Sequence, residues 1–163
     1  HSMGGYVSLK FAERYPERLE GLVMVTSNAR SDTLEKREAR FAEADLVIRS
    51  GMAAIAETMV QKLTTLTEFR QKVVPIINNT DPNGFFNVQH AIASRKNQLN
   101  LLGNLSIPVL AISGSEDQLM KSEVAYEMAK ASKLGSIVVL PGIGHLPMLE
   151  EPLALGSLIV SVL

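Results

Sequence analysis

The first residues of the chain, His1-Ser2-Met3-Gly4-Gly5, place a serine where nucleophilic chemistry is favoured. They match the second half of a nucleophile elbow, G-x-S-x-G, in which a sharp turn from a strand into a helix exposes a serine. That turn crowds the backbone, so Gly4 fits two positions after the serine, and Gly5 leaves room for neighbouring elements. Ser2 would be the nucleophile, and the Met3 N–H would point at the developing oxyanion. Alone, the same residues would also suit a flexible terminus or a cloning scar.

Two later loops offer the partners that a serine nucleophile needs. A free hydroxyl is protonated at neutral pH and requires an adjacent imidazole to accept its proton. His145, in the sequence Gly144-His145-Leu146-Pro147 after a strand-like run, is the candidate base, against the alternative of a buried core histidine. Asp117, in Ser115-Glu116-Asp117 after another such run, would accept the Nδ1–H of that imidazole. Glu116 is its rival, and a carboxylate that caps a turn is the alternative without chemistry.

The remaining titratable residues have simpler interpretations. His1 would line the site or pack beside it, and we expect His90 to be exposed on a helix. Asp32 suits the capping box that opens a helix. Glu150 and Glu151 would begin the last helix, where negative charge favours the N-terminal end of the dipole. The sequence holds neither a metal-ligand cluster of His and carboxylates nor a glycine-rich phosphate loop followed by Lys.

Hydrophobic patterning predicts the elements that would position these residues. A helix is expected over 4–15, with Val7, Phe11 and Tyr15 on one side and Pro16 as its end. Continuous apolar runs are typical of strands buried on both faces of a parallel sheet. Three such strands are predicted, at about 21–26, 108–113 and 136–140.

Residues 32–95 contain helical patterns and no strand-like run. A segment of this length is too long for a loop and too helical for a parallel sheet. The predicted helices are a charged one from Asp32-Thr33-Leu34-Glu35 to Gly51, a second over 52–63, a third over about 67–78 kinked at Pro75, and a fourth opened by Asp81-Pro82.

Composition excludes several classes of function. The 163 residues carry a formal net charge of −1, which argues against a nucleic-acid partner. A hydrophobic content of 46% suits a globular enzyme, and the absence of cysteine excludes disulfides and thiolate metal sites. No apolar run is long enough to span a bilayer. We expect no membrane association and a cytoplasmic location.

The chain order Ser2, Asp117, His145 matches that of the α/β-hydrolase triad. The sequence resembles the C-terminal part of an α/β-hydrolase-fold protein, close to the esterase and 3-oxoadipate enol-lactonase branch. The resemblance is carried by His1-Ser2-Met3-Gly4-Gly5, Phe11-Ala12-Glu13-Arg14-Tyr15-Pro16, Gly114-Ser115-Glu116-Asp117, Gly144-His145-Leu146-Pro147 and Glu151-Pro152.

This resemblance implies a fold. It implies an α/β class with a parallel sheet and flanking helices, a partial α/β-hydrolase core made of 1–31 and 96–163. Residues 32–95 would form an inserted helical cap over the active site. Apolar cap residues, with His1, would contact the substrate; the candidates are Phe85 and Phe86, together with Met52, Ile55 and Met59. The alternative for these apolar residues is packing in a core.

The resemblance also implies an activity, the hydrolysis of a small-molecule carboxylic ester or lactone through an acyl-enzyme. Ser2 would attack, His145 would shuttle the proton, Asp117 would orient it and Met3 would supply half of the oxyanion hole, without a cofactor. A serine at position 2 argues against dehalogenase and epoxide-hydrolase relatives, which carry Asp there. The alternatives are carbon–carbon bond hydrolysis, cofactor-free perhydrolysis, and a non-catalytic fragment or a binding module.

The chain begins inside its own elbow, so we expect the strand that feeds the elbow and the second oxyanion donor to be missing. Strand 21–26 would then have an unpaired edge, and Leu22 and Val25 would lose part of their cover. These losses predict that the isolated chain is poorly stable, self-associates through the exposed sheet edge and is nearly inactive.

Overall fold

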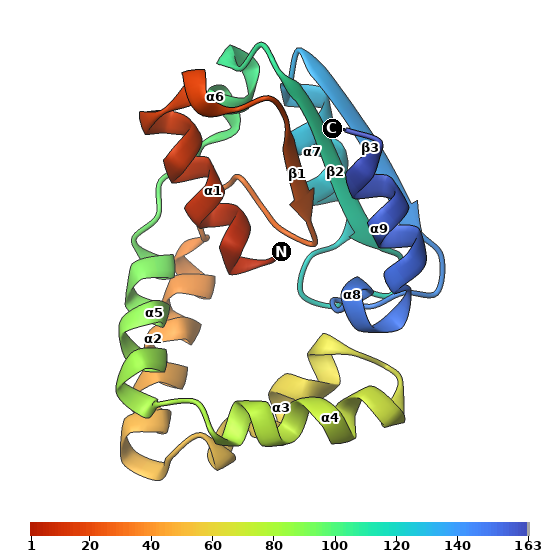
Figure 1. Ribbon diagram of the computed structural model, residues 1–163. Coiled ribbons are helices and arrows are strands. Elements are labelled where there is room, and N and C mark those ends of the chain that lie inside the picture. The colour runs from red at the N-terminus through yellow and green to blue at the C-terminus, as the bar shows by residue number, and fades with distance from the viewer. Residues whose placement is uncertain (163) are drawn as a thin grey trace. The chain divides into compact units, whose positions relative to one another are not determined.

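The computed structural model describes residues 1–162 and divides into two compact units (Figure 1). The first unit comprises His1–Arg30 with Asn97–Leu163, and the second is Ser31–Lys96. The second unit is therefore inserted into the first along the chain. Its role as a cap over an active site stays a prediction.

A three-stranded parallel sheet forms the centre of the first unit, which confirms the predicted fold class. Its strands are β1 (Leu22–Val25), β2 (Pro108–Gly114) and β3 (Leu134–Leu140), in the order β1-β2-β3. Leu22 pairs with Val109, and Pro108 pairs with Leu134. Within residues 1–162, no strand pairs with the outer side of β1. Self-association through this edge stays a prediction.

Alternation along the strands builds a core on each face of the sheet. Leu22 and Met24 of β1 and Ala111 of β2 point to the face covered by α1 (Met3–Arg14), α6 (Leu99–Asn104) and α7 (Ser122–Ala131). Val25 and Ile112 point to the other face, where they pack with residues of α9 (Pro152–Val160). Burial of both faces is the reason that the strands read as continuous apolar runs.

One expectation about apolar cover is wrong. Leu22 and Val25 are each only 6% exposed, because helices of this unit cover both faces of β1. On α1, the buried side consists of Gly5, Leu9 and Ala12. The opposite stripe is open: Val7, Phe11 and Tyr15 are 63%, 41% and 43% exposed.

Short helices complete the first unit. The segment η1 (Pro16–Arg18) follows α1, and α8 (Pro147–Glu150) precedes α9. The sequence patterns missed α6 and α8, since six and four residues are too few to display a helical period. Ser122 is the first residue of α7, and its hydroxyl shares a 3.2 Å hydrogen bond with that of Ser113.

The second unit is entirely helical within its described residues. It contains α2 (Leu34–Ser50), α3 (Ala53–Leu63), α4 (Thr67–Asn78, with Pro75 inside) and α5 (Pro82–Ala93). Thr33 caps α2 by accepting a hydrogen bond from the Lys36 N–H, and Asp81 caps α5. No helix in the described part of the chain is long and apolar enough to cross a membrane.

Asp32 is not the cap that the sequence suggested. Its carboxylate, 2% exposed, forms ion pairs with Arg40 Nε at 2.6 Å and with Arg95 Nη2 at 2.8 Å. Burial acts to raise the pKa of Asp32, but hydrogen bonds and charge attraction to Arg95 and Arg40 outweigh it, and the pKa lies below its ordinary value. Asp32 and Arg95 lie near the two ends of the helical unit, so their ion pair joins these ends. We call the ion pairs of Asp32 with Arg40 and Arg95 the clasp.

The clasp predicts a pH-dependent loss of stability. At neutral pH, Asp32→Asn should cost about 3 kcal/mol, because it leaves two arginines without their counter-charge. The pKa of Asp32 is lowered by folding, so its contribution is present above the unfolded pKa and disappears as the pH falls through the folded pKa. Denaturant unfolding at pH 7 and near pH 3 should therefore show the gap between parent and variant shrinking in acid.

The control is Glu127→Gln, which breaks the exposed pair with Arg30. An exposed pair contributes at most about 1 kcal/mol. If Asp32→Asn costs no more than this control, or costs the same at both pH values, the clasp does not stabilise the unit.

Candidate active site

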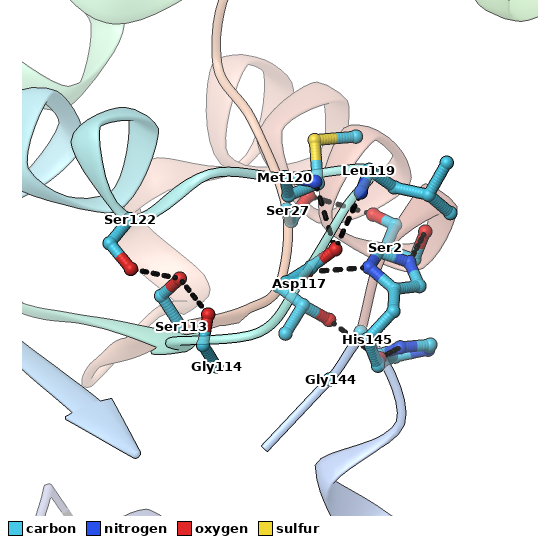
Figure 2. Close-up of polar contacts among 12 residues, drawn as sticks. Ser2, Ser27, Ser113, Gly114, Asp117, Leu119, Met120, Ser122, Gly144 and His145 are labelled. Carbon is cyan, nitrogen blue, oxygen red and sulfur yellow. Dashed lines mark hydrogen bonds and ion pairs between the residues drawn. The ribbon is translucent and has the colours of Figure 1, made fainter. Parts of the chain in front are cut away.

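Ser2, His145 and Asp117 meet at the carboxyl end of the sheet (Figure 2). Asp117 follows β2 and His145 follows β3, while Ser2 immediately precedes α1. Ser2 Oγ lies 2.9 Å from His145 Nε2, and His145 Nδ1 lies 2.7 Å from Asp117 Oδ2. With a proton on Nδ1 donated to the carboxylate, Nε2 is left to accept the serine proton. The geometry is that of a serine activated by an imidazole whose orientation a carboxylate fixes.

The backbone at Ser2 is strained and firmly held. Its φ is 46° and its ψ −120°, a conformation that is uncommon for a residue with a side chain. The Ser2 N–H donates to Val25 O at 2.9 Å, and its carbonyl accepts from the Ser27 hydroxyl at 2.7 Å. Met3 opens α1, so its N–H is among those at the helix start that have no partner within the helix. An anion near Ser2 Oγ would lie at this positive end of the dipole.

His145 is almost completely buried, with 1% of its surface exposed. Its own carbonyl oxygen lies 2.8 Å from His1 Nε2 and accepts from the Thr26 hydroxyl at 3.2 Å. The N–H of the preceding Gly144 donates to Glu150 Oε2 at 2.6 Å. Backbone contacts on both sides of the imidazole therefore hold its loop in place.

Burial and hydrogen bonding distinguish Asp117 from its rival. Asp117 is 5% exposed, whereas Glu116 is exposed and accepts a hydrogen bond from the Ser115 hydroxyl. The second carboxylate oxygen of Asp117 accepts the N–H groups of Leu119 and Met120 at 2.8 and 2.9 Å. These donors orient the carboxylate toward the imidazole.

The loops of Asp117 and His145 are in direct contact. The Glu116 N–H donates to Ile143 O at 2.9 Å. A side chain at Gly114 would collide with the carbonyl oxygens of Ile143 and Gly144. Gly114 therefore allows the loop that carries Asp117 to approach the loop that carries His145.

Other predicted site residues have different outcomes. His1 lies beside His145, with the two imidazole centroids 5.1 Å apart, and its contact with substrate stays a prediction. Phe85 and Phe86 belong to α5 in the helical unit, where Phe86 packs on His90 at 4.3 Å between ring centroids. Their contact with substrate also stays a prediction. Among residues 1–162, no group of three or more metal-ligating side chains comes together.

The sequence patterns missed three residues that contact the segments of Ser2 and His145, namely Thr26, Ser27 and Glu150. Thr26 and Ser27 continue β1, and nothing in their types or spacing indicated that they would bind the loops of His145 and Ser2. Glu150 was interpreted as a charge at a helix start, but it ends α8 and binds Gly144. Its other oxygen, Oε1, is buried without a hydrogen-bond partner among the described residues.

Comparisons with known proteins agree with this fold. The family model of the alpha/beta hydrolase fold matches residues 1–152. An esterase from Thermogutta terrifontis superposes with a TM-score of 0.91 at 34% identity, over 98% of this chain and 61% of that one. The enol-lactonase from Burkholderia xenovorans LB400 superposes with a TM-score of 0.83 at 23% identity, over 99% of this chain and 62% of that one, a likeness of fold.

A curated protein of Bacillus subtilis (strain 168) is 25% identical over 98% of this chain and 62% of its own length. It bears the provisional name 2-succinyl-6-hydroxy-2,4-cyclohexadiene-1-carboxylate synthase. The chain thus spans about three fifths of the length of these relatives.

The two adjacent glycines of the elbow should respond differently to substitution. A Cβ at Gly5 would lie 2.7 Å from Ser27 Cβ and would also overlap its hydroxyl, whereas a Cβ at Gly4 meets nothing within 4 Å. Gly5→Ala should therefore destabilise this chain by about 1–3 kcal/mol. Gly4→Ala, the matched control, should be neutral or add up to about 1 kcal/mol, since alanine favours helix. Equal denaturation midpoints for the two variants would contradict this packing.

Proposed function

Because the chain belongs to the alpha/beta hydrolase fold family, we propose that it provides the catalytic residues of a serine hydrolase that cleaves a carboxylic ester or lactone. The observation that carries the proposal is the hydrogen-bonded series from Ser2 Oγ through His145 to Asp117. The likeness to a Thermogutta terrifontis esterase, at 34% identity, supports an ester as the substrate class.

The proposed reaction begins when His145 Nε2 takes the hydroxyl proton of Ser2 as Oγ bonds to the substrate carbonyl carbon. Asp117 remains ionised and stabilises the imidazolium. The imidazolium then gives its proton to the alcohol oxygen as the carbon–oxygen bond breaks, which leaves an acyl group on Ser2. A water molecule repeats the sequence, with His145 again as base, and releases the acid.

The oxyanion of each tetrahedral intermediate needs a donor. We assign the Met3 N–H to this role because it lies next to the nucleophile at the start of α1. Backbone donors suit this task, since they are already oriented when charge develops on the substrate oxygen. No cofactor is required for this chemistry.

A second candidate is another reaction of the same superfamily on the same three residues. The Bacillus subtilis relative, with its provisional synthase name, favours this alternative over a binding module. Carbon–carbon bond hydrolysis and perhydrolysis are reactions of this kind. Ester hydrolysis that disappears with Ser2 would favour the first proposal.

Substitution of the proposed nucleophile and base provides the direct test. Ser2→Ala and His145→Ala should each lower kcat for 4-nitrophenyl acetate by several orders of magnitude, and the double variant should be no worse than either single one. The assay is made on the 163-residue chain and on the full polypeptide that its gene encodes. Steady hydrolysis by Ser2→Ala in the full polypeptide would exclude the acyl-enzyme mechanism.

We also propose that the helical unit shapes the acyl pocket through α5. If it does, Phe85→Ala and Phe86→Ala should shift the preference among acetate, butyrate and octanoate esters toward longer chains, because each removes a large apolar side chain. The control is Phe41→Ala on α2, which packs on the same His90 at 4.7 Å between ring centroids. A preference unchanged in both α5 variants, or shifted equally by the control, would remove Phe85 and Phe86 from the substrate site.

A further inference from the structure

Three consecutive residues at the end of β1 bind the loops of both proposed catalytic residues. Val25 O accepts the Ser2 N–H at 2.9 Å. The Thr26 hydroxyl donates to the carbonyl of His145 at 3.2 Å, and the Ser27 hydroxyl donates to the carbonyl of Ser2 at 2.7 Å. Figure 2 shows Ser27 on the segment beside Ser2 and His145. One short segment thus contacts the nucleophile and the base independently of the hydrogen bond between them.

Thr26 adopts an unfavourable backbone conformation to make this contact. Its φ is 41°, in the left-handed region that a β-branched residue rarely enters. Such a conformation costs about 1–3 kcal/mol and persists only where the surroundings fix it. Glycine would avoid the cost but would lose the hydroxyl. A function of the Thr26 hydroxyl would explain why a strained threonine, and not glycine, occupies this position.

Both side chains lie in the interior, where a hydroxyl must be matched to an acceptor. Thr26 is 1% exposed and Ser27 is 2% exposed. In addition, Ser27 lies directly against Gly5, and the absence of a side chain at Gly5 lets the first turn of α1 pack against the Ser27 hydroxyl. These two hydroxyls donate to backbone carbonyls, and their bonds therefore constrain the main chain at Ser2 and at His145.

We propose that Thr26 and Ser27 are positioning residues that set the distance between Ser2 Oγ and His145 Nε2. Thr26 fixes the backbone of the base, and Ser27 fixes the backbone of the nucleophile. Because Thr26 and Ser27 are adjacent, a single segment fixes the backbone of Ser2 relative to the backbone of His145. This inference rests on the proposed function and goes beyond it, since neither residue touches the reacting atoms.

The variants separate the hydroxyl from the shape of the side chain. In the full polypeptide, Thr26→Val keeps the shape and removes the donor, whereas Thr26→Ser keeps the donor and removes a methyl group. A displacement of about 1 Å at a reacting group can cost about a hundredfold in rate. We therefore expect Thr26→Val and Ser27→Ala to lower kcat for 4-nitrophenyl acetate about 10- to 100-fold, with KM within about twofold of the parent. Thr26→Ser should stay within about threefold of the parent.

Two further variants test whether a loss of activity is caused by a loss of folding. Thr26→Gly removes the hydroxyl and also relieves the positive φ, so it should fold and still be slow. Ser132→Ala is the matched control, since this serine also donates to a backbone carbonyl, Met128 O at 2.8 Å, within the same unit. Its kcat should be unchanged, because Ser132 contacts neither Ser2 nor His145.

A second measurement does not depend on the natural substrate. Diisopropyl fluorophosphate forms a phosphorus–oxygen bond with Ser2 as fluoride leaves and the hydroxyl proton passes to His145. Its inactivation rate constant should fall in Thr26→Val and Ser27→Ala by the same factor as kcat. In a His145→Ala background, Thr26→Val should have no further effect, because the base through which it acts is absent.

The outcomes are distinct. If Ser2→Ala removes hydrolysis while Thr26→Val, Thr26→Gly and Ser27→Ala all retain the parent kcat, the positioning role is wrong and the proposed function stands. If Thr26→Ser is as slow as Thr26→Val, the side chain acts by packing, and the role of the hydroxyl is wrong. If Ser2→Ala leaves hydrolysis unchanged, the proposed function itself fails.

Discussion

The 2.9 Å separation of Ser2 Oγ and His145 Nε2 joins residues that are 143 positions apart in the chain, and the parallel sheet makes it possible. Parallel strands end at the same edge, so the segments that follow β1, β2 and β3 emerge beside one another. The segment after β2 carries Asp117 and the segment after β3 carries His145. Apolar packing on both faces of the sheet fixes the register, and the register fixes where these loops begin.

Hydrogen bonds to the backbone then fix the positions of the segments that carry Ser2, Asp117 and His145. The elbow is tied to β1 through Val25 and Ser27, the base loop is tied to Thr26 and Glu150, and the acid loop contacts the base loop through Glu116. Two of the residues involved, Ser2 and Thr26, have positive φ values. Both lie at the meeting of the elbow and β1, where the favourable energy of the packed sheet offsets the local strain.

How much of this could be predicted from the sequence depends on the range of each signal. Ser2 lies in a recognisable motif, and Asp117 and His145 lie in short loops after apolar runs, so their meeting could be expected from chain order. The cap at Asp81 could also be predicted, because it depends on neighbours along the chain. Thr26 could not, since a threonine after a strand is common and its function depends on His145, which lies 119 positions away.

What the sequence left undecided or misassigned has a similar cause. The stripe of Val7, Phe11 and Tyr15 has the period of a buried helix face, but a sequence does not show which of two apolar faces meets the sheet. Small residues determine which face of α1 is buried, because Gly5 and Ala12 allow the helix to approach its neighbours closely. Asp32 was misread because a carboxylate at a helix start suits a cap, whereas its partner Arg95 lies 63 positions away.

Asp32 and Asp117 together show what makes a buried carboxylate suitable as the partner of an imidazole. Both have side chains that are nearly inaccessible, at 2% and 0% exposed. Asp32 is paired with two guanidinium groups, whose permanent positive charges balance its carboxylate at neutral pH. In the described structure, Asp117 receives two backbone N–H groups and one imidazole, so the charge that balances it arises only when His145 takes a proton. A carboxylate of this second kind can stabilise the imidazolium that forms during the proposed reaction, and this difference supports Asp117 as the partner of His145 in that mechanism.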